Sequence, residues 1–165
     1  SKAHDCRRVF RRGYPKDDGP EKLSDAEIKR SAYNVYLRKY LRCVKGVDDN
    51  LKRLFADLEK RGEMDNTVIF YTGDQGFMLG EHDNQDKRWM YDESLKMPFV
   101  AKWPSVTKPG SRDKHLTQNL DHAQTLLQLA GAPIPDDMQG VSLDPPLRGE
   151  SPKDRRKTIY VHYYE

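Results

Sequence analysis

The clearest pattern of apolar and polar positions lies in the first third of the chain. Apolar side chains recur at steps of three and four from Ile28 to Leu58, the spacing of one face of an amphipathic helix. Ser24 and Glu27 have the S-x-x-E form of a capping box, and Gly62 can supply a left-handed cap. The pattern predicts one long helix between these signals. A coiled coil is the alternative, but tyrosine-rich contacts favour packing against a sheet.

Three later segments have the composition of strands. Residues 67–72 are a nearly continuous apolar run, as in a strand covered on both faces. Residues 97–103 predict a second strand that stops at Pro104, and residues 158–164 predict a third. A long helix followed by a buried strand predicts an α/β fold, in which the strands form part of a mixed β-sheet with flanking helices.

A second helix is predicted over residues 118–130, capped by Asn119 or Asp121 and closed by Gly131. The segments between these elements are rich in Gly, Pro and charge. They predict irregular surface structure at residues 1–22, 73–93 and 131–157. The second of them is longer than most connections in compact domains, and such loops often carry function.

The composition is that of a polar globular chain, with 33% charged and 36% hydrophobic residues over a length of 165. No apolar run approaches the roughly 20 residues that span a bilayer, and no signal peptide is present, so the sequence leaves the compartment open. Residues 1–46 carry 13 Lys/Arg against 6 Asp/Glu, and residues 47–165 carry 16 against 20. The basic part could bind a polyanion, but a solvated helix surface is the favoured interpretation, and no nucleic acid partner is expected.

The two cysteines form no metal-binding pattern. Cys43 falls on the apolar face of the predicted helix, which predicts a buried thiol. Cys6 lies next to Arg7, which can lower a thiol pKa, but a nucleophile also needs a base and a pocket. Neither residue is therefore favoured as a catalytic group.

Candidate metal ligands follow the first buried strand. Asp74 and Gln75 come directly after it, and Gly76 lets the backbone turn sharply beside them. A carboxylate and a carboxamide oxygen suit calcium or magnesium better than zinc. Because Asp-x-Gly is also common turn chemistry, a simple turn is the alternative. A calcium site needs roughly six to eight oxygens, so further ligands must come from elsewhere.

Two further candidates lie in the same loop. Lys87 could supply a positive group to an oxyanion substrate beside the metal, although a surface lysine paired with Asp86 is the alternative. His82 could donate a proton or contact an oxyanion, although a lone loop histidine more often does neither. The chain has no G-x-S-x-G, P-loop or H-E-x-x-H motif.

At these residues the chain resembles the C-terminal half of the sulfatase family, in the alkaline-phosphatase-like superfamily. The resemblance covers roughly residues 38–165. It is carried by the combination of Asp65-Asn66-Thr67-Val68-Ile69, Thr72-Gly73-Asp74-Gln75-Gly76, Leu79-Gly80-Glu81-His82, Asp86-Lys87-Arg88, Met97-Pro98-Phe99-Val100, Thr125-Leu126-Leu127 and Pro135-Asp136-Asp137-Met138-Gln139-Gly140.

The resemblance implies a role for each candidate. Asp74 is similar to the metal-bridging aspartate of the family, Gln75 to the ligand beside it, and the ion in most members is calcium. Lys87 resembles the lysine that contacts the substrate sulfate, whereas His82 matches only some relatives. Together with Asp86-Lys87-Arg88, the aromatic ending at residues 160–165 resembles glycan sulfatases of the N-acetylglucosamine-6-sulfatase type, with a sulfated carbohydrate as the substrate. On this basis residues 1–157 are expected to be the C-terminal part of the catalytic domain, and residues 158–165 the start of the C-terminal subdomain.

The family nucleophile is a formylglycine made from Cys or Ser in a C-x-P-S-R or S-x-P-x-R type motif. Neither cysteine lies in such a motif, and the first pair of metal aspartates is also absent. The resemblance therefore implies a sulfuric ester hydrolase whose nucleophile lies outside this chain, in a periplasmic, secreted or lysosomal parent. A phosphodiesterase or phosphonate hydrolase of the same superfamily is one rival, which Gln75 argues against because a carboxamide is a poor zinc ligand. A non-catalytic polyanion-binding module is the other.

This chain by itself is expected not to hydrolyse sulfate esters, because only the charge-stabilising half of the chemistry is present. The purified chain, free of host sulfatase, can be assayed for sulfate release. Turnover well above the buffer blank would contradict the expectation.

Overall fold

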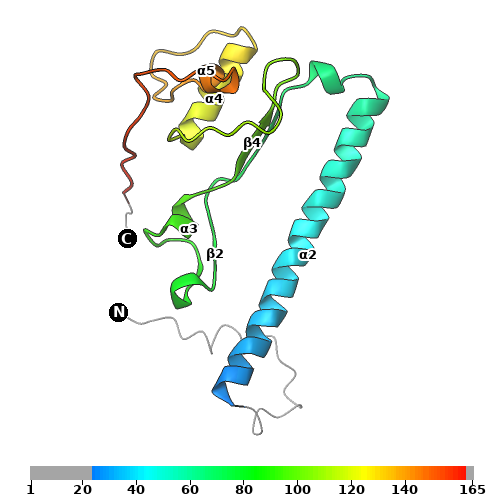
Figure 1. The fold of residues 1–165 in the computed structure, drawn as a ribbon, viewed down its shortest axis with the longest axis vertical. Coiled ribbons are helices and arrows are strands. Elements are labelled where there is room, and N and C mark those ends of the chain that lie inside the picture. Colours follow the sequence, from blue (N-terminus) through cyan, green and yellow to red (C-terminus); the bar gives the residue numbers. More distant parts are fainter. Residues whose placement is uncertain (1–23, 163–165) are drawn as a thin grey trace. The chain divides into compact units, whose positions relative to one another are not determined.

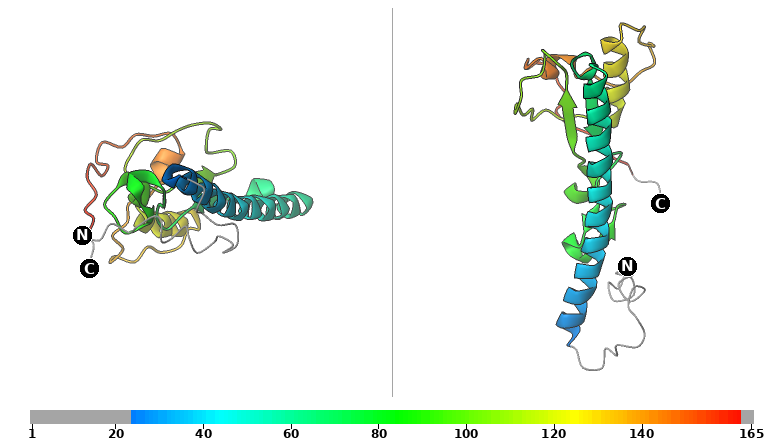
Figure 2. Two further views of the ribbon diagram at one scale, coloured as in Figure 1. Left: turned by 90° about the horizontal axis from the view of Figure 1, so that it is seen from below. Right: turned by 90° about the vertical axis from the view of Figure 1, so that its right-hand side faces the viewer.

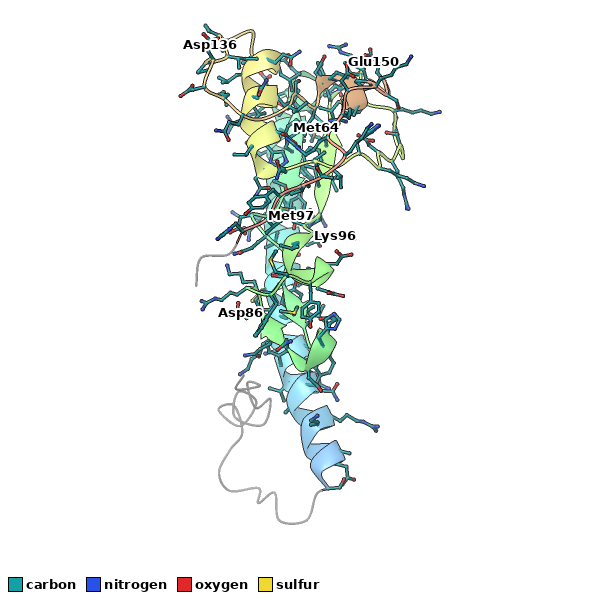
Figure 3. All side chains as sticks on the ribbon, turned by 90° about the vertical axis from the view of Figure 1, so that its left-hand side faces the viewer. Met64, Asp86, Lys96, Met97, Asp136 and Glu150 are labelled. Atoms are coloured by element: carbon teal, nitrogen blue, oxygen red, sulfur yellow. The ribbon has the colours of Figure 1, made fainter. Side chains whose placement is uncertain are left out.

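The computed structural model describes residues 24–162 of the chain (Figure 1). The described residues divide into two compact units. Unit 1 comprises residues 24–64 and 75–96, and unit 2 comprises residues 65–74 and 97–162. Met64, Lys96 and Met97, labelled in Figure 3, stand at two of the three points where the chain passes from one unit to the other.

Unit 1 contains the long helix that the apolar spacing predicts. Helix α2 spans Asp25–Lys60 and is unbroken in both views of Figure 2. Its capping box is formed, since the Ser24 N–H donates to Glu27 Oε2 at 2.9 Å and the Glu27 N–H donates to Ser24 Oγ at 3.4 Å. Gly62 follows the helix at φ 71°, in the left-handed region that glycine favours. Both ends of the helix are therefore confirmed.

The apolar face of α2 is covered over only part of its length. Near its start Ala32 is buried, and Tyr40 stacks on Phe77 with ring centroids 6.3 Å apart. Further along, Val44 remains 47% exposed. Cys43 is also exposed, so the prediction of a buried thiol is wrong. The helical spacing identifies the apolar face correctly, but the part of unit 1 that the structure describes has nothing packed over Cys43. The other cysteine, Cys6, lies outside the described residues.

The predicted loop at 73–93 is partly structured. Strands β2 (Met78–Leu79) and β3 (Gln85–Asp86) pair antiparallel, and a 3-10 turn, η4 (Glu81–Asp83), joins them. The short helix α3 (Asp92–Leu95) follows, and the side chain of Met78 on β2 is fully buried. Strands of two residues are too short to show an alternating pattern, which is why the sequence predicts only a loop.

Unit 2 is built around a strand pair. After the 3-10 turn η3 (Met64–Asn66), strand β1 (Ile69–Thr72) pairs antiparallel with β4 (Phe99–Lys102). Both strands were predicted. However, Tyr71 is 43% exposed, so β1 is not covered on both faces within the described residues. Its only ladder among residues 24–162 is with β4, which leaves one of its edges open.

Two helices complete unit 2. Helix α4 spans Asn119–Leu129 and Gly131 follows it at φ 65°, as predicted, but the N-cap residue is Gln118 rather than Asn119 or Asp121. Helix α5 (Asp144–Leu147) lies in the segment that was expected to be an irregular surface connection. Residues 158–162 are irregular rather than strand, because the described chain offers no neighbouring strand to pair with them. The domain division at residue 157 stays a prediction.

A buried carboxylate joins distant parts of unit 2. Asp121 is fully buried and accepts hydrogen bonds from Arg156 Nη1 at 2.7 Å and Nη2 at 3.0 Å. Its oxygens also accept from the N–H of Val141 at 2.8 Å and of Gln118 at 2.7 Å. Burial alone would raise the pKa of Asp121, but Arg156 and these two N–H groups together hold that pKa below its usual range.

The depressed pKa of Asp121 predicts a loss of stability in acid. The ionised Asp121 contributes fully to the free energy of unfolding above its unfolded-state pKa of about 4. This contribution disappears as the pH falls towards the lower folded-state pKa. Asp121→Asn should lower the free energy of unfolding at pH 7 by about 3 kcal/mol, because Arg156 loses its counter-charge. Urea unfolding at pH 7 and pH 3 measures both effects, with the exposed Asp137→Asn as the control. If Asp121→Asn lowers the free energy of unfolding by as much at pH 3 as at pH 7, the stability does not depend on the ionisation of Asp121 and the prediction is wrong.

Candidate functional site

The two predicted metal ligands lie just after β1. Asp74 is exposed and belongs to unit 2, whereas Gln75 is half-buried and belongs to unit 1. The backbone carbonyl of Asp74 accepts a hydrogen bond from Asn119 Nδ2 on α4 at 2.8 Å. The boundary between the two units therefore runs through the peptide bond that joins the two candidate ligands.

Gly76 fixes the turn after these residues. It is buried, and its N–H donates to the Ser94 carbonyl at 2.9 Å. A Cβ atom at this position would lie 2.2 Å from the Glu93 carbonyl oxygen and 2.4 Å from that of Lys96. Only glycine allows the backbone to pass this close to the end of α3. The turn interpretation of Asp-x-Gly is thus correct for the backbone, and it is compatible with ligand roles for the two side chains that precede it.

Lys87 lies directly after β3 and is half-buried. On either side of it, Asp86 at φ 78° and Arg88 at φ 103° are in the left-handed region, which is uncommon for residues other than glycine. The Arg88 N–H donates to Ser94 Oγ at 3.1 Å, which holds the backbone on one side of Lys87. Strain of this kind persists only where the surroundings impose it, and it clusters at functional sites.

The expected surface pair between Lys87 and Asp86 is not formed. Asp86, labelled on β3 in Figure 3, instead faces Arg88, with Nε and Oδ2 separated by 3.9 Å. Within residues 24–162 no ion pair includes Lys87. A half-buried lysine that no carboxylate of the described chain neutralises is suited to an anionic ligand.

His82 is held by two neighbours that the sequence did not indicate. Its ring stacks on Tyr91 with centroids 4.0 Å apart and an interplanar angle of 11°. Its Nε2 lies 3.3 Å from Glu93 Oε2, and its backbone is left-handed at φ 56°. The imidazole is therefore oriented rather than loose, although it remains exposed at the surface of unit 1. Tyr91 and Glu93 could not be found from spacing, since they lie beyond the hairpin.

Asp74 and Gln75 offer the type of ligand atom that a hard cation prefers, but two residues are too few ligands for a complete site. Both supply oxygen, the ligand atom that calcium and magnesium prefer. No group of three or more His, Cys, Asp or Glu able to hold a metal occurs in the described part of the chain. Hence these residues can form only part of a site, and a tight metal complex requires oxygen ligands from other segments or from water.

Comparison with known proteins identifies the family. The family model for "N-sulphoglucosamine sulphohydrolase, C-terminal" matches residues 80–165, which is more than half of the chain. The chain therefore belongs to the sulfatase family, and its α/β structure is part of the alkaline-phosphatase-like fold.

One curated relative and two solved structures show which members of the family this chain is similar to. The chain is 50% identical to the N-acetylglucosamine-6-O-sulfatase of Bacteroides thetaiotaomicron over 135 residues, which cover 81% of this chain and 24% of that protein. A structure solved with its substrate D-glucosamine-2-N,6-O-disulfate is 47% identical with a TM-score of 0.81, covering 87% of this chain and 29% of that one. The phosphonate monoester hydrolase of Silicibacter pomeroyi is 32% identical with a TM-score of 0.71, covering 89% and 29%. The chain thus spans about a quarter of the length of the curated relative.

Gly76 offers a direct test of the turn. Gly76→Ala should destabilise the protein by about 1–3 kcal/mol, because the added methyl group collides with two backbone carbonyls that cannot rotate away. Gly46→Ala is the matched control. It has open space around its Cβ position and lies inside α2, so it should instead raise stability by about 0.5–1 kcal/mol. Urea unfolding of both variants measures the difference, and equal stability of the two would show that the turn is not tightly packed.

Proposed function

We propose that this chain is part of an enzyme that hydrolyses sulfate esters on a sulfated glycan containing glucosamine. The observation that carries the proposal is the 50% identity to a protein named N-acetylglucosamine-6-O-sulfatase over most of the chain. It is supported by the structural match to a protein solved with a disulfated glucosamine. The substrate class here is a sulfated carbohydrate, and removal of a 6-sulfate from glucosamine is the specific form that we propose.

Asp74 and Gln75 are the proposed metal ligands. Their oxygens suit calcium, and the remaining ligands would come from segments outside this chain. A bound calcium ion would supply a positive charge that stabilises the sulfate oxygens as negative charge develops on them. Gly76 permits the tight turn after the two ligands, because only a residue without a Cβ atom fits against the carbonyls of Glu93 and Lys96.

Lys87 is the proposed sulfate contact. Its ammonium group would bind a sulfate oxygen and stabilise the transition state by charge. This assignment is supported by its half-buried position and by the absence of a carboxylate partner for Lys87 in residues 24–162. The hydrogen bond from the Arg88 N–H to Ser94 Oγ restrains the backbone next to Lys87, which reduces the entropy lost when substrate binds.

His82 is proposed to donate a proton to the leaving alcohol or to contact the sulfate. Stacking on Tyr91 fixes the plane of the ring, and Glu93 Oε2, 3.3 Å from Nε2, fixes its direction. The nucleophile is proposed to be a formylglycine that lies in the part of the protein outside this chain.

A periplasmic, secreted or lysosomal location for the whole protein is also proposed; it is supported by 31% identity over 115 residues to a Drosophila melanogaster protein named as an extracellular sulfatase homolog. Among residues 24–162 the structure has no helix that is both long and apolar enough to cross a membrane.

Phosphonate ester hydrolysis is the second candidate. It is favoured by the match to the phosphonate monoester hydrolase, since a phosphonate ester resembles a sulfate ester in shape and in negative charge. The carboxamide at Gln75 argues against any form of this activity that depends on zinc, because zinc prefers imidazole and thiolate ligands to carboxamides.

The test is sulfate release by the full-length protein from glucosamine 6-sulfate and its N-sulfated form. Lys87→Ala and Asp74→Ala should each lower kcat by about 10²–10³-fold, since each removes a positive charge or its ligand from the transition state. Ion chromatography of released sulfate is the measurement.

Lys108→Ala serves as the control, because this exposed lysine lies outside the proposed site and should leave turnover unchanged. The proposal that the protein is a glycan sulfatase is wrong if it cleaves phosphonate monoesters faster than any sulfated sugar. The assignment of residues fails separately if sulfate release survives both site substitutions.

A further inference from the structure

One side chain of α4 reaches the backbone of the candidate metal site. Asn119 Nδ2 donates to the carbonyl oxygen of Asp74 at 2.8 Å, across 45 positions of sequence. This carbonyl belongs to the peptide unit that links Asp74 to Gln75. The hydrogen bond fixes the plane of that peptide unit, and so the ψ angle of Asp74 and the φ angle of Gln75, the backbone torsions next to both side chains that we propose as ligands. The hydrogen bond therefore acts on two ligands through one atom.

The first turn of α4 is itself fixed to the strand pair that leads to Asp74. His122, on this turn, stacks on Phe99 of β4 with centroids 4.9 Å apart and an interplanar angle of 19°. Phe70 of β1 meets Phe99 edge-on at 5.3 Å and His122 at 6.4 Å. Since β1 ends two residues before Asp74, the same small cluster sets the position of both hydrogen-bonding partners.

The first turn of α4 is also held by segments that follow the helix in the sequence. A Cβ atom on Gly140 would lie 2.3 Å from the Leu120 carbonyl oxygen, so the backbone of the following segment runs directly against α4. Asp121 holds Val141 and Arg156 through the hydrogen bonds already described. Asn119 thus projects from a support that is rigid before any metal binds, which is what an outer residue needs to orient a ligand.

We propose that Asn119 is a positioning residue for the metal site: its hydrogen bond to the Asp74 carbonyl holds the Asp74–Gln75 peptide in the orientation that binds calcium. The inference rests on the proposed function, because it assumes that these two residues bind the ion. Asn119 does not touch the metal or the substrate. A purely structural role predicts a different result, because an exposed carbonyl that loses this donor can be solvated by water at little cost to folding.

The experiment measures calcium affinity rather than activity alone. Calcium is titrated by calorimetry into the metal-free full-length protein, its Asn119→Ala and Asn119→Asp variants, and Gln128→Ala as an exposed amide control on the same helix. Both Asn119 variants should bind calcium about 10–100-fold more weakly. Asn119→Asp keeps the shape and suits the start of a helix, so its metal-free melting temperature should match the wild type. Gln128→Ala should bind as the wild type does.

Sulfate release provides a second readout. The two Asn119 variants should lose turnover at limiting calcium and recover it at saturating calcium, which a folding defect would not do. Unchanged calcium affinity in both Asn119 variants, with a wild type that binds calcium, overturns this inference and leaves the proposed function intact. A wild type that hydrolyses sulfate esters without binding calcium overturns both the metal assignment and the inference.

Discussion

The buried charge of Asp121 is the constraint on which unit 2 depends. Removing a carboxylate from water costs several kcal/mol unless an opposite charge and hydrogen bonds replace the lost hydration. The replacements come from three separate stretches of chain: the residue before α4, the segment after it, and Arg156 near the end of the described region. Satisfying one carboxylate therefore fixes the relative positions of all three. The buried Thr125, whose Oγ1 accepts from the Leu143 N–H at 2.8 Å, repeats the arrangement one turn further along α4.

Local signals were sufficient to predict the elements whose ends are specified by neighbouring residues. The start of α2 depends on Ser24 and Glu27, which are three positions apart, and its end depends on Gly62. Properties that depend on distant segments were not predictable. The exposure of Cys43 is decided by what covers the helix rather than by the helix itself. The N-cap of α4 is a local case: Asp121, three residues on, reaches back to the N–H of Gln118, and the general preference for Asn and Asp at caps does not indicate this capping box.

The candidate site also contains residues that the sequence could predict and residues that it could not. Residue type and a resemblance to sulfatases were enough to select Asp74, Gln75, His82 and Lys87, and the roles proposed for them still depend on that resemblance. The groups that hold these residues could not be selected from sequence. Asn119 contacts Asp74 across 45 positions, and Glu93 approaches His82 from the far side of a hairpin whose strands are two residues long. Contacts of this kind follow from the path of the backbone, which no short motif specifies.

The left-handed backbone around Lys87 has a consequence for protein engineering. Glycine at Asp86 or Arg88 would remove an unfavourable conformation worth about 1 kcal/mol or more, so selection for stability alone would favour it. Glycine would also free the backbone beside the lysine. The non-glycine residues at positions 86 and 88 therefore combine conformational restraint beside Lys87 with a cost in stability, a combination that is common where activity and stability conflict. A consensus-based programme of thermostabilisation should therefore leave these two positions untouched.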